Sequence, residues 1–170
     1  MDGWSSLIKY KKQKTMKKFI LLLFVSFSLN SFSQQSSLDW HTDMNKAIEI
    51  SVKTQKPMLL FFTGSDWCGW CKRLVKEVYD RPEFAKWAKN NVVLVEIDFP
   101  RRSKLSEETQ KQNRELQQMF GVRGYPTIWF VKPETKNQAS VNLSQLGSTG
   151  YVAGGPSKWI ESAEKILSKK

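Results

Sequence analysis

Cys68 and Cys71 are the only thiols in the chain, and two residues separate them. This C-x-x-C spacing puts the second sulfur about one helical turn from the first, so the pair can close a small, reversible disulfide. If a helix starts at the pair, the first sulfur lies at its positive end, where unpaired backbone N–H groups favour a thiolate. The pattern therefore predicts redox chemistry, with Cys68 as the more exposed and more reactive sulfur.

Two other uses of the spacing have to be weighed. Zinc ribbons share it, but a closed zinc site takes four ligands, and this chain adds only one remote histidine, His41. We therefore expect no metal and no cofactor. A purely structural disulfide stays open as an alternative, although so short a loop removes little chain entropy and stabilises a fold weakly.

The segments around the cysteines have the pattern of a strand, a loop and a helix. Residues 57–63, Pro-Met-Leu-Leu-Phe-Phe-Thr, form an apolar run that is typical of a buried strand. The strand leads through residues 64–66 into the cysteines, and residues 72–78 continue with a helical pattern. Further along, residues 121–130 read Gly-Val-Arg-Gly-Tyr-Pro-Thr-Ile-Trp-Phe.

The W-C-x-x-C motif together with the G-V-x-G-x-P-T stretch resembles the thioredoxin family, over roughly residues 39–168. The resemblance implies an α/β, thioredoxin-like fold with a central mixed sheet of four to five strands flanked by helices. It also implies a cis peptide bond before Pro126, in a loop that faces the cysteines. In such proteins the residue matching Cys68 attacks a disulfide of a protein substrate, and the residue matching Cys71 then releases that substrate.

The resemblance also assigns supporting residues to the site. It implies that the two flanking tryptophans are partly exposed apolar contacts for a substrate, and that the loop before the third strand pairs with the substrate chain like a strand edge. The supporting residues are Trp67, Gly69, Trp70, Tyr125 and Pro126. The Gly-Trp pair between the cysteines matches none of the best-known dipeptides of the superfamily, so it does not decide the direction of electron flow. The basic residues that follow, Lys72 and Arg73, could help to lower the pKa of the Cys68 thiol, but they are expected to be ordinary solvated helix surface.

One family feature is missing. Thioredoxins carry a buried acid in the strand before the motif, and that place falls here at Phe61 or Phe62, which cannot accept a proton. Glu96, within a predicted strand over 92–98, is a possible substitute as proton acceptor for the second cysteine, because an acid in an apolar strand is costly unless it has a role. The alternative is that Glu96 points to solvent or pairs with a lysine. Asp66 is a second candidate, or only a loop residue.

The start of the chain has the pattern of a secretory signal. Two lysines at 17–18 precede an eleven-residue apolar run at 19–29, and small residues precede a cleavage point after Ser33. A membrane span would need about 20 apolar residues. We expect residues 1–15 to be an upstream extension, 16–33 the signal peptide and 34–38 a leader. The protein would then be periplasmic or extracellular.

Charge argues against nucleic acid as a partner. Removal of residues 1–33 takes away six lysines and one aspartate, which leaves 21 basic and 15 acidic residues and a net charge of +6 instead of +11. The remaining positive charge is dispersed. The densest cluster, residues 101–104, is offset by Glu107 and Glu108 and is expected to be a solvated loop. The expected partners are cysteine-containing proteins and a membrane-bound or soluble thiol electron donor, and we expect a monomer.

The remaining pattern predicts further elements within the domain. Thr42 is expected to cap a helix that ends near Lys56, and Ser106 a helix that runs to Met119. Other helices are expected over 68–79 and 82–87 and after the Gly-Gly-Pro at 154–156, and further strands over 126–132 and 140–146.

Three classes of function compete. The leading one is an exported thiol–disulfide oxidoreductase that reduces protein disulfides. The second is a thioredoxin-fold module that binds peptides or proteins with a non-catalytic disulfide, and the third is a metal-binding or metal-delivery protein. Reduction of insulin, with a Cys68→Ser control, separates the first class from the second, and metal content after purification tests the third.

Overall fold

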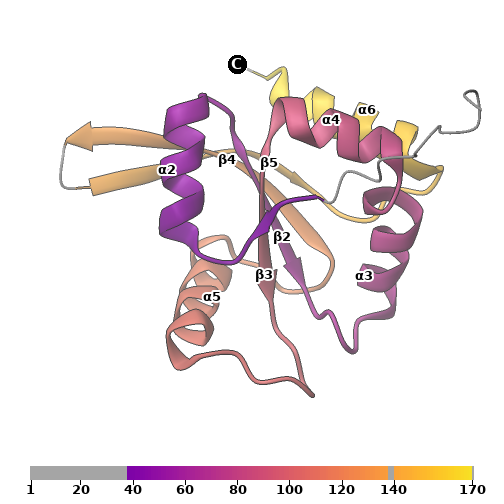
Figure 1. The fold of residues 1–170 in the computed structure, drawn as a ribbon, viewed down its shortest axis with the longest axis horizontal. Helices are drawn as coiled ribbons and strands as arrows, with labels where there is room; N and C mark the ends of the chain where they lie inside the picture. The colour runs from indigo at the N-terminus through magenta and orange to yellow at the C-terminus, as the bar shows by residue number, and fades with distance from the viewer. Residues whose placement is uncertain (1–37, 138–139, 170) are drawn as a thin grey trace, which may run out of the picture. The chain divides into compact units, whose positions relative to one another are not determined.

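A computed structural model describes residues 38–137 and 140–169. Its sheet has five strands in the order β1-β3-β2-β4-β5 (Figure 1). β3 pairs in parallel with β1 and β2, whereas β4 runs antiparallel to β2, and β5 runs antiparallel to β4. The predicted α/β fold with a mixed sheet is therefore confirmed. The strands are β1 (Trp40–His41), β2 (Met58–Thr63), β3 (Val93–Asp98), β4 (Thr127–Asn137) and β5 (Ser140–Thr149).

Helices cover both faces of this sheet. In Figure 1, α2 (Met44–Thr54) and α5 (Glu107–Met119) lie on one side of the strands. The other side carries α3 (Gly69–Leu74), which continues as the π-helical turn η1 (Val75–Tyr79), together with α4 (Pro82–Asn91) and α6 (Gly155–Leu167).

The central strand β2 separates two apolar layers, and every one of its residues is buried. Because side chains alternate along a strand, Leu59 and Phe61 face the layer that contains the two cysteines, and Leu60 and Phe62 face the layer under α2 and α5. A strand buried on both faces reads as an unbroken apolar run, which is what the sequence shows at this place.

Trp159 on α6 lies at the centre of the layer that contains the cysteines. Its side chain is fully buried, and its indole N–H donates a hydrogen bond to the Gly150 carbonyl at 3.1 Å. The aromatic rings around it come from η1, α4 and β4, so one residue joins three elements: its partners are Tyr79, Phe84, Trp87 and Phe130.

Several element boundaries differ from the sequence-based expectation. Asp43, rather than Thr42, caps α2, because its carboxylate accepts hydrogen bonds from the backbone N–H groups of Asn45 and Lys46. The helix ends before Gln55, whose φ of 57° is left-handed. α4 runs on to Asn91 instead of ending at Trp87.

The sheet also extends beyond its expected limits. β1 has only two residues and was not predicted, because so short a strand carries no periodic pattern. β4 and β5 are longer than expected and pair along their length as a hairpin, whose far end extends past α2 in Figure 1. Leu38, assigned to the leader, packs against the layer that contains the cysteines.

The predicted signal peptide at 16–33 and the extension at 1–15 lie outside the described residues. No helix within residues 38–137 and 140–169 has the length and apolar character that a membrane crossing requires.

Candidate active site

Cys68 and Cys71 form a disulfide, with their Cα atoms 5.3 Å apart. The strand-loop-helix order predicted for this segment is confirmed, since the pair follows the carboxyl end of β2 and opens α3. Cys68 is the N-cap of α3, and its Sγ accepts a hydrogen bond from the Cys71 backbone N–H at 3.1 Å. This donor and the helix dipole would stabilise a thiolate on Cys68 after reduction.

Both cysteines are buried, but not to the same degree. Cys68 is 6% exposed and Cys71 is 1% exposed, so the first cysteine is the more exposed member of the pair, as the sequence predicts. Leu74, one turn further along α3, is fully buried and anchors the helix in the same apolar layer.

Trp67 is half-buried and held from several directions. Its indole N–H donates to the Phe99 carbonyl at 2.7 Å, and its ring meets the Tyr125 ring edge-on at a centroid distance of 5.7 Å. The absence of a side chain at Gly64 makes room for it, because a Cβ there would lie 2.6 Å from Trp67 Nε1. The Arg101 guanidinium covers the ring, 3.9 Å from its centroid.

Trp70, between the two cysteines in the sequence, is 55% exposed. Its ring lies 5.3 Å from that of Tyr151, and the Arg73 guanidinium lies over both rings at 5.3 and 5.2 Å. Arg73 also pairs with Glu77 at 2.8 Å, and the Tyr151 hydroxyl donates to the same carboxylate. These contacts hold the pKa of Glu77 below its usual value, the Tyr151 hydrogen bond contributing most.

Sequence reasoning placed Arg73 on solvated surface and missed Tyr151. Tyr151 and Glu77 are 74 positions apart, and no motif signals their contact. Lys72 is likewise engaged, since its Nζ donates to the Asp66 carbonyl at 2.9 Å. Both basic side chains are exposed, as the sequence predicts, and each also has a polar partner near the site.

The loop before β4 completes the site. The Tyr125–Pro126 peptide bond is cis. The Tyr125 ring joins Trp67 to Phe99, and the Gln117 side-chain amide donates to its hydroxyl at 2.7 Å. Burial, and secondarily the charge of Asp98, raises the pKa of the Tyr125 hydroxyl.

Glu96 lies half-buried on β3, opposite Phe61 of β2. Both positions face the apolar layer that contains the cysteines, because side chains alternate along a strand and Leu94, two residues before Glu96, lies in that layer. Burial, and to a lesser degree the charge of Asp98, raises the pKa of the Glu96 carboxyl. No hydrogen bond or ion pair joins this carboxylate to another residue of the described ranges, so the lysine partner considered above is not seen there.

Asp66 has a structural role in the loops around the site. Its carboxylate accepts hydrogen bonds from the backbone N–H groups of Arg101 (3.0 Å), Arg102 (2.6 Å) and Ser103 (3.4 Å). These bonds, the one from Arg101 contributing most, lower the pKa of the Asp66 carboxyl. A carboxylate occupied in this way is a poor proton acceptor for a thiol.

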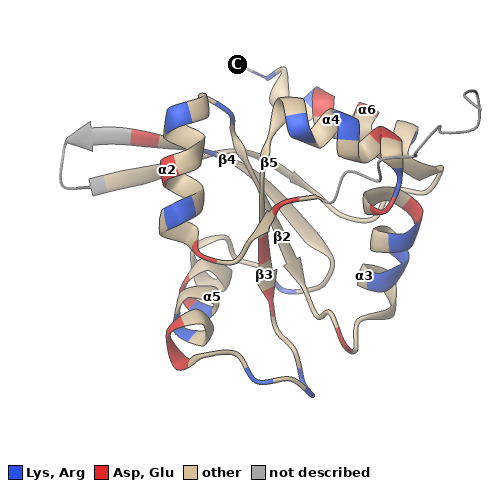
Figure 2. Cartoon of the chain, in the orientation of Figure 1, with Lys and Arg blue, Asp and Glu red and all other residues tan. Residues whose placement is uncertain are grey.

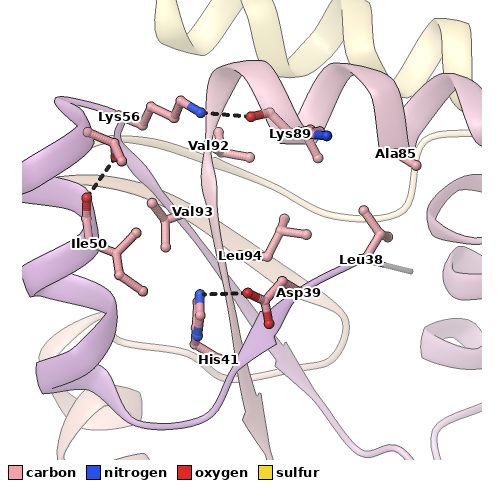
Figure 3. Close-up of a pocket in the computed structure, with 12 residues that line it drawn as sticks. Leu38, Asp39, His41, Ile50, Lys56, Ala85, Lys89, Val92, Val93 and Leu94 are labelled. Carbon is pink, nitrogen blue, oxygen red and sulfur yellow. Dashed lines mark hydrogen bonds and ion pairs between the residues drawn. The ribbon is translucent and has the colours of Figure 1, made fainter. Parts of the chain in front are cut away.

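A cavity of about 270 Å³ lies away from the cysteines, between α2, α4 and the start of β3 (Figure 3). His41 and Asp39 line it, 3.8 Å apart, and Lys56 donates to the Lys89 carbonyl at its rim. The carboxyl end of β2, which leads to the cysteines, is at the opposite end of the parallel pair β2–β3. Within the described ranges, no three His, Cys, Asp or Glu side chains come together as a metal site would require.

A disulfide at a helix start whose first cysteine is the more exposed, near an X-Pro loop and two aromatic flanks, can be exchanged with another thiol or disulfide. The fold and this site define a thiol–disulfide oxidoreductase. The family model described as "Thioredoxin-like domain" matches residues 44–142, so the chain belongs to the thioredoxin-like family.

Individual relatives agree with this assignment. The chain is 35% identical over 118 residues to "Disulfide bond reductase DsbH" of Chlamydia pneumoniae, a match covering 69% of this chain and 70% of the relative. It is 29% identical to "Thioredoxin-related protein DsbJ" of the same organism, over 81% of this chain and 39% of that protein. A solved structure titled "DsbH Oxidoreductase" superposes with a TM-score of 0.71 and 29% identity, covering 84% of this chain and 94% of the other.

Proposed function

We propose that this protein is an exported reductase of protein disulfides, in which Cys68 is the nucleophile and Cys71 the resolving thiol. The observation that carries the proposal is the asymmetry of the pair: Cys68 is the more exposed cysteine and caps α3, whereas Cys71 is shielded behind it. The relative named as a disulfide bond reductase supports the reducing direction.

The reaction balances as two exchange steps. The Cys68 thiolate attacks one sulfur of a substrate disulfide, a bond forms between them, and the second substrate sulfur leaves as a thiolate that takes up a proton. Cys71 then loses its proton and attacks Cys68 Sγ, which expels the first substrate sulfur and re-forms the Cys68–Cys71 disulfide. Two electrons have passed to the substrate, and a thiol donor has to return them to the protein.

The surroundings of the pair suit these steps. The hydrogen bond from the Cys71 N–H to Cys68 Sγ and the start of α3 favour the attacking thiolate. Trp70 offers an exposed apolar surface, and the Tyr125–Pro126 loop offers backbone groups to the substrate chain. We assign Glu96 as the acceptor of the Cys71 proton, because it is half-buried on the same side of the sheet and its pKa is raised.

Insulin reduction and a redox titration test the function. The protein with Cys68→Ser should have no activity, and Cys71→Ser should accumulate a mixed disulfide with the substrate. Equilibration against glutathione should give a reduction potential nearer to the roughly −270 mV of a reductant than to the roughly −120 mV of a strong oxidant. A potential at the oxidising end, or insulin reduction that survives Cys68→Ser, would refute the proposal.

Export follows from the predicted signal at residues 16–33 and is tested separately. Full-length protein made in a bacterium should be recovered from the periplasm or the medium, with Gln34 as its first residue. Recovery of the uncleaved chain from the cytoplasm would overturn this part and leave the redox chemistry unaffected.

A further inference from the structure

The loop after β3 is fixed against the active site. Residues 101–104 form an exposed basic loop, as the sequence predicts, and the Asp66 carboxylate accepts three successive backbone N–H groups from it. Asp66 lies two residues before Cys68. The loop is therefore tied by its main chain to the segment that carries the nucleophile.

This tether places the Arg101 side chain over Trp67. The guanidinium carbon lies 3.9 Å from the centroid of the indole, well within the range of a cation–π contact. The indole of Trp67 is itself held by its hydrogen bond to the Phe99 carbonyl and by its contact with the Tyr125 ring, so the ring under the guanidinium has a defined position. Arg101 remains an exposed residue although its position is fixed.

The two Arg–Trp stacks beside the disulfide differ in charge. Arg73, over Trp70, is neutralised by Glu77 at 2.8 Å. No carboxylate forms an ion pair with Arg101 anywhere in the described ranges, and its neighbours Arg102 and Lys104 are also basic. Figure 2 shows this basic loop at the tip of the connection between β3 and α5. Within the described residues, the Arg101 guanidinium is therefore not held in an ion pair, whereas that of Arg73 is.

We propose that Arg101 is a specificity-determining residue that binds an acidic side chain next to the cysteine of the substrate. The proposal rests on the proposed reductase function. A planar guanidinium held on an aromatic ring keeps its N–H donors free at the edge, where a carboxylate can take two of them. Because the cation is already positioned, little side-chain entropy is lost when the acid binds. Protein disulfides with Asp or Glu beside the cysteine are the preferred substrate class.

The test uses a set of short disulfide-linked peptides that differ only in the residue beside one cysteine: Glu, Gln or Lys. We expect the wild-type protein to reduce the Glu peptide with a kcat/KM about three- to fivefold above that for the Gln peptide, as for an exposed but well-oriented ion pair. The Lys peptide should be slower than the Gln peptide. The preference should shrink as salt is added, because the pair is solvent-exposed.

Three variants distinguish a specific effect of the Arg101 side chain from an effect of the overall positive charge of the loop. Arg101→Gln should remove the preference, so that the Glu and Gln peptides are reduced with the same kcat/KM. Arg101→Lys keeps a cation without the planar fork and should retain only part of the preference. Arg102→Gln removes the same charge one residue away, where the side chain does not cover Trp67, and should keep the full preference.

The outcomes distinguish this inference from the function on which it rests. If the Gln peptide is not reduced at all by the wild-type protein, the reductase proposal fails. If the Gln peptide is reduced but the Glu peptide has no advantage, or if Arg102→Gln removes the advantage as fully as Arg101→Gln, the role of Arg101 is refuted and the reductase proposal stands.

Discussion

A single carboxyl group, that of Glu96, shows how residue-level physics links stability to the reaction. Burial among apolar neighbours raises its pKa, and Asp98 adds to the shift. Since the pKa in the folded protein is above that in the unfolded chain, the folded state binds more protons between the two values. Stability falls as the pH rises through that window, and ionised Glu96 destabilises the fold above it.

Glu96→Gln should therefore have opposite effects on stability and on turnover. At pH 7 the variant should resist urea better than the wild type, and at a pH below the ordinary carboxyl range the two should unfold at the same urea concentration. The decay of a trapped mixed disulfide should slow, while the first attack by Cys68 stays nearly unchanged, because only Cys71 depends on this acceptor.

Glu164→Gln, an exposed charge change on α6, is the matched control and should alter neither quantity. Equal slowing of both exchange steps, or of neither, would show that Glu96 is not the proton acceptor.

Residues that carry their own chemistry could be predicted from the sequence. The two cysteines were found from their type and spacing, and the flanking tryptophans and the proline loop from the resemblance of their motifs to the thioredoxin family. Arg101 and Tyr151 were not identified as parts of the site, because their roles arise from contacts between distant segments. A single sequence contains no signal that Arg101 covers Trp67.

At the scale of elements, the loop after β3 depends on one carboxylate. Backbone hydrogen bonds lower the pKa of Asp66, so its contribution to stability is present above the pKa of the unfolded chain and is lost as the pH falls through the lower, folded value. The loop therefore loosens in acid.

Asp66→Asn should reduce stability at neutral pH and flatten the acid side of the stability profile, because an amide offers only one acceptor oxygen to three backbone N–H groups. Urea midpoints between pH 2.5 and 7 measure this. Asp80→Asn, at an exposed position after η1, is the control. An unchanged acid profile in Asp66→Asn would contradict the tether.

Elements with strong patterns were predicted and weakly patterned ones were not. The strand at 58–63 and the helix capped by Ser106 follow from an apolar run and a capping side chain, which accepts the Thr109 N–H at 3.1 Å. The end of α4 has the sequence Lys-Asn-Asn, which reads as a loop. The sequence of the outer part of the β4–β5 hairpin lacks the alternation of apolar and polar residues that is typical of a half-buried strand. The length of the hairpin could therefore not be predicted from the sequence.

Across the whole described domain, one sheet carries two apolar layers. Trp159 centres the layer that contains the cysteines, and Phe62 lies fully buried in the other, against Phe120 at a centroid distance of 6.0 Å. Because β2 contributes to both layers, neither can open without exposing the other side of the same strand, and we expect a single cooperative transition.

Trp159→Ala and Phe62→Ala should each lower the free energy of unfolding by about 3–5 kcal/mol, the range for emptying a large aromatic site in a core. Urea unfolding followed by circular dichroism and by fluorescence should show one coincident transition for the wild type and for both variants. Lys111→Ala on the exposed face of α5 should change stability by less than about 0.5 kcal/mol. Separate transitions for the two layers would refute a shared core.

The tether between Asp66 and the loop has a consequence for how such a protein can diversify. Asp66 accepts main-chain N–H groups, which every residue except proline supplies. The side chains at 101–103 are therefore free to vary while the loop keeps its place. With the proposed role of Arg101, substrate preference and redox chemistry then depend on separate stretches of the chain. The loop could be exchanged between relatives without disturbing the cysteines.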